Sequence, residues 1–119
     1  MSTIVHFDIP VDDIARAKKF YTELFEWKIE RMPGEIEYYG IRTFGENGKE
    51  GVAGGMGKRG EPSQRIANYI GVESIEKCLK KVEQLGGSVI MQKTKIPGYG
   101  YLAICTDTEN NVFGLWEKE

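Results

Sequence analysis

The sequence has few of the residues that most often carry catalysis or bind metals. It contains one histidine, His6, and two cysteines, Cys78 and Cys105, which form no CxxC pair. Cysteines separated in this way are typical of reduced, partly buried thiols. A nucleophilic cysteine would need His6 as its base, and that pairing stays open although no motif supports it.

Other absences argue against whole classes of protein. Sixteen Lys and Arg residues stand against eighteen Asp and Glu, a net charge of −2, so no basic excess would neutralise nucleic-acid phosphates. No run approaches the roughly 18 apolar residues of a membrane span. The first residues lack the basic and apolar regions of a signal peptide. We therefore expect a cytoplasmic protein without a nucleic-acid or membrane partner.

The composition is that of one small globular domain. The chain has 119 residues, of which 40% are hydrophobic and 11% aromatic, enough for one core and too few for two independent domains. Glycine is unusually frequent, with fifteen residues, about twice the usual share. Glycines inside strand-like segments mark places where another group approaches the backbone closely.

The first half of the chain predicts a strand, a helix and three further strands. The helix starts after Asp12 or Asp13, and its apolar residues recur at steps of three and four until it ends near Glu26. Turn sequences rich in Pro, Gly and Asn separate the strands. The expected strands are Thr3–Ile9, Trp27–Arg31, Glu37–Phe44 and Gly51–Met56.

The second half repeats this order after a polar linker, at about residues 58–64. Ser74 is placed to cap a second helix, and Gly86-Gly87 to end it. The expected strands are Arg65–Val72, Ser88–Lys93, Tyr101–Thr106 and Val112–Glu117. We therefore divide a single domain, residues 1–119, into module one (about 1–57), the linker, and module two (about 65–119).

Matching segments indicate that the two modules arose by duplication. Val11–Ile14 aligns with Val72–Ile75 at an offset of 61, and Val52–Gly55 with Val112–Leu115 at an offset of 60. A ferredoxin-like domain would place two strands after its first helix and one after its second, whereas this chain predicts three after each. The expected fold class is α+β, with two tandem βαβββ modules.

This doubled module resembles the vicinal oxygen chelate superfamily, which includes glyoxalase I, bleomycin-resistance proteins, fosfomycin-resistance enzymes and extradiol dioxygenases. Phe20–Trp27 is similar to the end of the family's first helix, with Glu26 in place of the common Gly, and Tyr101–Trp116 is similar to its last hairpin. The short relatives of lactoylglutathione lyase are the nearest subgroup. The resemblance implies curved mixed sheets around a cavity, a small organic ligand and a homodimer.

The resemblance also implies four metal-ligand positions, one on the first and one on the last strand of each module. They fall on His6, Ala67, Gly54 and Gly114, and three of these residues have no donor side chain. Asn68 or Glu117 would be a poor substitute, whereas Asp8 shares a face with His6. We therefore expect no bound catalytic metal and no cofactor.

Alternation along the first strand places His6 and Asp8 on the face turned away from the helix. They form either a hydrogen-bonded pair that fixes the sheet or an acid/base pair in which Asp8 raises the pKa of His6. The same parity predicts a ligand cavity, with Tyr38, Tyr39, Arg42 and Tyr101 as candidates for its rim. The expected lining residues are Gly54, Met56, Ala67, Tyr69, Gly114 and Trp116.

Two functions fit these residues. One is a glyoxalase-related lyase or isomerase that uses His6 and Asp8 as acid and base without the usual metal site. The other is a non-catalytic protein that sequesters a small planar or aromatic molecule, as bleomycin-resistance proteins do. The missing metal ligands favour the binding protein, and the two ionisable groups on one strand favour the enzyme.

Overall fold

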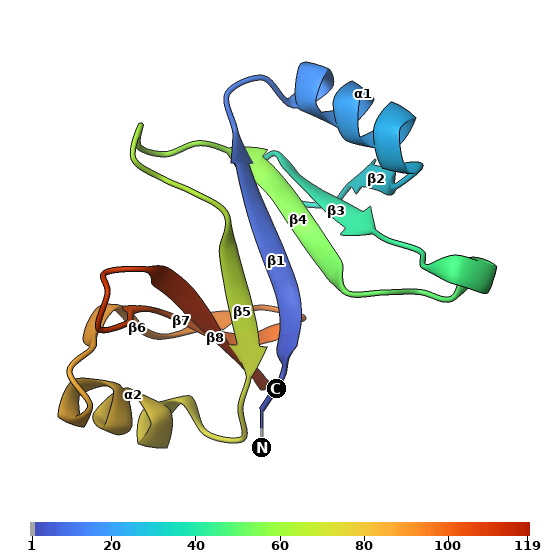
Figure 1. Ribbon diagram of the computed structural model, residues 1–119. Coiled ribbons are helices and arrows are strands. Elements are labelled where there is room, and N and C mark those ends of the chain that lie inside the picture. Colours follow the sequence, from blue (N-terminus) through green and yellow to red (C-terminus); the bar gives the residue numbers. More distant parts are fainter. Residues whose placement is uncertain (1) are drawn as a thin grey trace. The chain divides into compact units, whose positions relative to one another are not determined.

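The computed structural model describes residues 2–119, which form two compact units. One unit comprises residues 6–66, and the other comprises residues 67–119 together with residues 2–5. Each unit has one helix and four strands in the order strand, helix, strand, strand, strand (Figure 1). The repeated βαβββ order and the α+β class predicted from the sequence are confirmed.

The unit of residues 6–66 is a four-stranded mixed sheet with one helix. Its strand order is β2-β3-β4-β1, in which β1 and β4 are parallel and the other neighbours antiparallel. A short 3₁₀ turn, Glu46–Gly48, lies between β3 and β4. The elements are β1 (Ile4–Val11), α1 (Ile14–Phe25), β2 (Lys28–Arg31), β3 (Tyr38–Arg42) and β4 (Ala53–Lys58).

Helix α1 packs on one face of this sheet and leaves the other face to the site described below. The Asp13 side chain caps it by accepting the N–H of Arg16 at 2.9 Å. Glu26 ends it in the left-handed conformation, with φ of 59°, at the position where the resembling family has Gly. The core between helix and sheet consists of Ile9, Val11, Ile14, Ile29, Ile41 and Met56.

The unit of residues 67–119 repeats this arrangement, with the strand order β5-β8-β7-β6 and a parallel β5–β8 pair. Its core joins α2 to one face of the sheet through Ile75, Leu79, Ala103, Cys105 and Leu115. Cys105 is buried and Cys78 half-buried, and both are free thiols. The elements are β5 (Ala67–Gly71), α2 (Ile75–Gln84), β6 (Ser88–Ile96), β7 (Gly100–Thr106) and β8 (Val112–Lys118).

Element bounds differ from the prediction mainly at strand ends. Strand β1 continues through Pro10 to Val11, because Pro10 keeps its place opposite Gly57 on β4. Strand β6 extends to Ile96 across two register shifts in its pairing with β7. Within residues 2–119, neither helix has the length and apolar character needed to cross a bilayer.

Glu117 joins three elements of the unit of residues 67–119. Its Oε1 accepts the N–H of Ile75 at the start of α2 at 2.8 Å, and its Oε2 lies 3.2 Å from the Lys93 ammonium on β6. The N–H of Ile75, and then Lys93, hold the pKa of Glu117 below its usual value. This side chain, weighed above as a substitute metal ligand, is occupied as a helix cap.

We predict that Glu117→Ala lowers the free energy of unfolding by about 1–3 kcal/mol at neutral pH, because a buried N–H loses its charged acceptor. A carboxyl whose folded-state pKa is lowered stabilises the fold above its unfolded pKa, and that stability is lost as pH falls through the folded pKa. The difference from wild type should therefore shrink in acid. Urea unfolding at several pH values measures it.

Glu119→Ala is the matched control, since Glu119 is an exposed partner of Lys95 at 3.5 Å and such pairs contribute little. Equal losses for the two variants would show that Glu117 acts as an ordinary surface charge.

Candidate functional site

Strand β4 has glycines where its neighbours need room. In the register of the sheet, Gly55 lies opposite Asp8 on β1, and Gly57 lies opposite Tyr38 on β3. A Cβ atom on Gly55 would overlap the Tyr38 hydroxyl, and one on Gly57 would come within 3.3 Å of the Tyr38 ring. The side chain of Tyr38 therefore extends over β4 and reaches the strand on its far side.

This reach makes a hydrogen-bonded chain of three side chains. The Tyr38 hydroxyl donates to Asp8 Oδ1 at 2.8 Å, and His6 Nε2 lies 3.1 Å from the same hydroxyl oxygen. A tyrosine hydroxyl has one proton to give. Because that proton goes to Asp8, His6 must donate from Nε2, which places the lone pair of the neutral imidazole on Nδ1.

Burial shifts both ionisable groups toward their neutral forms. It raises the pKa of Asp8, against the hydrogen bond from Tyr38 and the charge of His6. It lowers the pKa of His6, and the opposing effect of Asp8 is smaller. The expectation that Asp8 raises the pKa of His6 is therefore wrong in net direction, because desolvation outweighs the attraction of the carboxylate.

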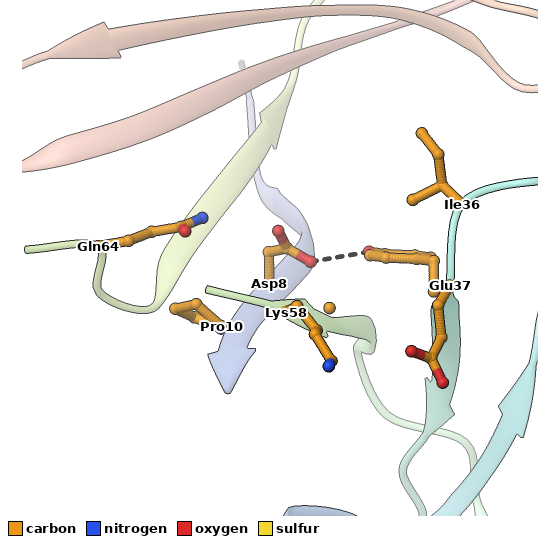
Figure 2. Close-up of a pocket in the computed structure, with 8 residues that line it drawn as sticks. Asp8, Pro10, Ile36, Glu37, Lys58 and Gln64 are labelled. Carbon is orange, nitrogen blue, oxygen red and sulfur yellow. Dashed lines mark hydrogen bonds between the residues drawn. The ribbon is translucent and has the colours of Figure 1, made fainter. Parts of the chain in front are cut away.

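A cavity of about 420 Å³ opens beside Asp8 and Tyr38, on the face of the sheet opposite α1. Figure 2 shows Asp8 among the side chains that line it, with the dashed hydrogen bond to Tyr38. Polar and apolar groups line it together, so the cavity offers a carboxyl group, an amide and some apolar surface to one ligand. Its lining residues are Asp8, Pro10, Ile36, Glu37, Tyr38, Gly57, Lys58 and Gln64.

The amide of Gln64 has a fixed direction in this cavity. Its Oε1 accepts the N–H of Gly60 at 2.7 Å, which leaves its amide N–H groups as the donors beside the cavity (Figure 2). Arg59 holds the same loop by donating to Asp12 Oδ1 at 3.0 Å, to the Pro10 carbonyl at 3.2 Å and to the Gln64 carbonyl. The loop is therefore tied to the end of β1.

Two of the expected lining residues face the core instead. Met56 is fully buried beside Ile9 and Ile41, and Gly54 makes room for the Phe7 ring, which a Cβ atom there would approach to 2.5 Å. The predicted offset of 60 between the last strands is one too large, since Met56 and Leu115 are the equivalent core residues. A slip of one residue exchanges the faces of a strand.

The other expected lining residues, Ala67, Tyr69, Gly114 and Trp116, belong to the unit of residues 67–119. Tyr69 pairs in register with Gly114, and Trp116 lies two residues beyond it, on the face opposite α2. A Cβ atom on Gly114 would overlap the Tyr69 ring. The space expected there for a ligand is filled by that ring, and Ala67 starts the same strand.

Of the four rim candidates, Tyr38 lines the cavity. Tyr39 and Tyr101 pack against the two cores, and Arg42 pairs with Glu50. Sequence reasoning missed Lys58 and Gln64, which it assigned to a linker. The signal for them was the polar character of that segment, directly after a strand that carries the site.

The residues around His6 do not suit the divalent ion that the resembling family often holds. On the face of β4 that Asp8 shares, the side chains are those of Ala53, Gly55 and Gly57, which offer no donor. Within residues 2–119, no three His, Cys, Asp or Glu side chains come together at one point. One imidazole and one carboxylate, both hydrogen-bonded to Tyr38, are too few to hold such an ion firmly.

Comparison with known proteins gives one family. The model of the Glyoxalase/Bleomycin resistance protein/Dioxygenase superfamily matches residues 3–115. CFP32 of Mycobacterium tuberculosis, which carries a glyoxylase name, is 31% identical over 113 residues, covering 92% of this chain and 43% of that protein. The anthracycline biosynthesis protein DnrV of Streptomyces peucetius is 28% identical over 128 residues, covering 94% and 46%. The chain thus spans less than half the length of these curated relatives.

Solved structures share the fold at low identity. Protein BH1468 from Bacillus halodurans superposes with a TM-score of 0.72 at 15% identity, covering 99% of this chain and 95% of that one. A methylmalonyl-CoA epimerase from Streptomyces coelicolor superposes with a TM-score of 0.70 at 10% identity, covering 97% and 96%.

We predict that Asp8→Asn raises the free energy of unfolding at neutral pH. A carboxyl whose folded-state pKa is raised contributes stability that is present below its unfolded pKa and lost as pH rises through the folded pKa. Asn has no charge at any pH, so the variant should not lose this stability as pH rises. Its gain over wild type should therefore vanish in acid, where Asp8 is protonated in the folded and the unfolded protein. Urea unfolding of both proteins across this pH range measures it, and a variant less stable than wild type at every pH would contradict it.

Proposed function

Because the chain belongs to the Glyoxalase/Bleomycin resistance protein/Dioxygenase superfamily, we propose that it binds a small oxygenated organic molecule in the cavity at Asp8 and moves a proton within it. The reaction class is that of a glyoxalase-related lyase or isomerase working without the usual metal site. The relative CFP32 carries a glyoxylase name, and the fold is shared with an epimerase. Both support a proton-transfer reaction.

The observation that carries the proposal is the chain from His6 through Tyr38 to Asp8. Asp8 and Tyr38 line the cavity, whereas His6 stands behind Tyr38. A carboxylate whose pKa is raised toward neutrality is a better base than an exposed one. In this proposal Asp8 removes a proton from a carbon of the ligand and returns it to a neighbouring atom.

Tyr38 and His6 then keep Asp8 in position, and both lower its pKa against the effect of burial. When Asp8 takes a proton, it no longer needs the hydrogen bond from Tyr38, and the hydroxyl is released to donate toward the ligand. The N–H of His6 stabilises the hydroxyl oxygen throughout. We therefore assign Asp8 the role of base, Tyr38 that of a hydrogen-bond donor to the ligand and His6 that of a positioning residue.

Removing a proton beside a carbonyl leaves negative charge on its oxygen, which must be stabilised. The donor available in the cavity is the directed amide of Gln64. Ile36 and Pro10 offer apolar surface to the rest of the bound ligand (Figure 2). A small carbonyl compound with one apolar side fits these groups.

Binding without turnover is the second candidate. The residues around His6 do not suit a divalent ion, and the relative DnrV is named for anthracycline biosynthesis. A protein that sequesters a small molecule needs the cavity and its donors but no base. The two candidates differ in whether a carbon-bound proton of the ligand exchanges.

To test the proposal, small 2-oxoaldehydes, hydroxyketones and aromatic ketones are screened for raising the melting temperature. Compounds that bind are then incubated in D₂O and followed by NMR. We expect wild type to exchange a carbon-bound proton of a bound compound. Asp8→Asn should lower the exchange rate at least about a hundredfold, the usual share of general acid–base catalysis. Tyr38→Phe should lower it by a smaller factor.

Gly55→Ala and Gly57→Ala provide a matched pair. The new methyl group displaces the Tyr38 hydroxyl in the first variant and touches the edge of its ring in the second. The first should lose exchange and the second should keep most of it. Binding without exchange in wild type would select the sequestering function, and exchange that survives Asp8→Asn would remove Asp8 from its role.

A further inference from the structure

Asp8 keeps one carboxylate oxygen for a ligand. Its Oδ1 accepts the Tyr38 hydroxyl at 2.8 Å, whereas no group within residues 2–119 donates to its Oδ2. In the same part of the chain, no fully buried side-chain oxygen lacks a hydrogen-bond partner. Oδ2 is therefore accessible, and Asp8 lines the cavity. A bound molecule meets an acceptor that carries part of the carboxylate charge.

The guanidinium nearest to this cavity is occupied. Arg59 donates to Asp12 Oδ1 at 3.0 Å, to the Pro10 carbonyl at 3.2 Å and to the Gln64 carbonyl, so each of its three nitrogens already has an acceptor. Carboxylates and phosphates are commonly recognised through the paired N–H groups of an arginine. Arg59 holds a loop in place and is not available for that role.

The other charged side chains of the cavity leave the sign of the charge at Oδ2 to Asp8. Lys58 and Glu37 both line the cavity, and Figure 2 shows the charged end of each extending away from Asp8. Their opposite charges offset each other. The ion pairs formed by Lys and Arg within residues 2–119 do not include Asp8, and burial keeps His6 toward its neutral form.

We propose that the cavity selects uncharged carbonyl compounds and discriminates against carboxylates and phosphates. The inference rests on the proposed function, because it takes this cavity as the place where the ligand binds. The amide of Gln64 can donate to a carbonyl oxygen, and Asp8 Oδ2 can accept an N–H or O–H group of the same ligand. Both contacts suit a neutral molecule.

An anionic group would place a second negative charge beside Asp8. Asp8 is half-buried, so water screens the repulsion less than at an open surface, and like charges brought together oppose binding. Burial already raises the pKa of Asp8, and a second anion would raise it further. Such a ligand would bind together with a proton, which is scarce at neutral pH.

Benzoylformamide and benzoylformate test this selection. The two compounds have nearly the same size and shape, and they differ where the amide has an NH₂ group and the acid a negative oxygen. Neither has a hydrogen on a carbon next to its ketone, so calorimetry at neutral pH measures binding without proton transfer. We expect wild type to bind the amide at least about tenfold more tightly than the acid, which is 1.4 kcal/mol.

Asp8→Asn keeps the shape of the side chain and removes its charge, so it should lose most of this preference, mainly by gaining affinity for the acid. Asp8→Ala should lose the preference as well. Glu35→Gln is the matched control, because it removes the same charge from an exposed residue that does not line the cavity. It should keep the preference of wild type. Cooperative melting transitions show that the variants fold.

An acid that binds wild type as tightly as the amide would overturn the proposal, as would an amide that does not bind. A preference that both Asp8→Asn and Asp8→Ala keep would also overturn it, since Asp8 would then not be its source. The reaction can fail separately. A preference for the amide, with no exchange of any bound compound in D₂O, would support the selection and remove the proton transfer.

Discussion

The contact between Tyr38 and Asp8 is possible because two residues of β4, Gly55 and Gly57, have no side chain in its way. One strand, β4, lies between Tyr38 on β3 and Asp8 on β1, and the Tyr38 hydroxyl reaches across it because Gly55 and Gly57 leave the space free. Burying a carboxyl in this way disfavours its charge, and the hydrogen bond offsets part of that cost. The glycines of β4, the raised pKa of Asp8 and the proposed reaction are thus all linked to the contact between Tyr38 and Asp8.

The two units show how a repeated βαβββ module is put to different uses. In residues 6–66 the face opposite the helix carries Asp8 and Tyr38, and the glycines of β4 make room for them. In residues 67–119 the corresponding glycine, Gly114, makes room for the Tyr69 ring. Glu117, near the end of the last strand, caps α2. In the proposed function the unit of residues 6–66 carries the chemistry, whereas in residues 67–119 Gly114 makes room for packing and Glu117 caps a helix.

Periodicity and capping residues were sufficient to predict the elements and the βαβββ order, because those signals are local. His6 and Asp8 were placed on one face by strand alternation alone. The cavity lining was predicted less well. The run Ala53-Gly54-Gly55 has no side-chain pattern to fix its register, so Gly54 and Met56 were assigned to the wrong face. The direction of the His6 pKa also failed, since burial depends on packing that no local pattern reports.

His6 donates a hydrogen bond to Tyr38, and Tyr38 donates one to Asp8. The direction of these two hydrogen bonds can be tested directly. His6 is the only histidine, so a long-range ¹H–¹⁵N NMR spectrum reports on its ring alone. The account predicts a neutral ring at neutral pH with its proton on Nε2, and a pKa below that of a free histidine. A ring protonated on Nδ1, or a cationic ring at neutral pH, would contradict it.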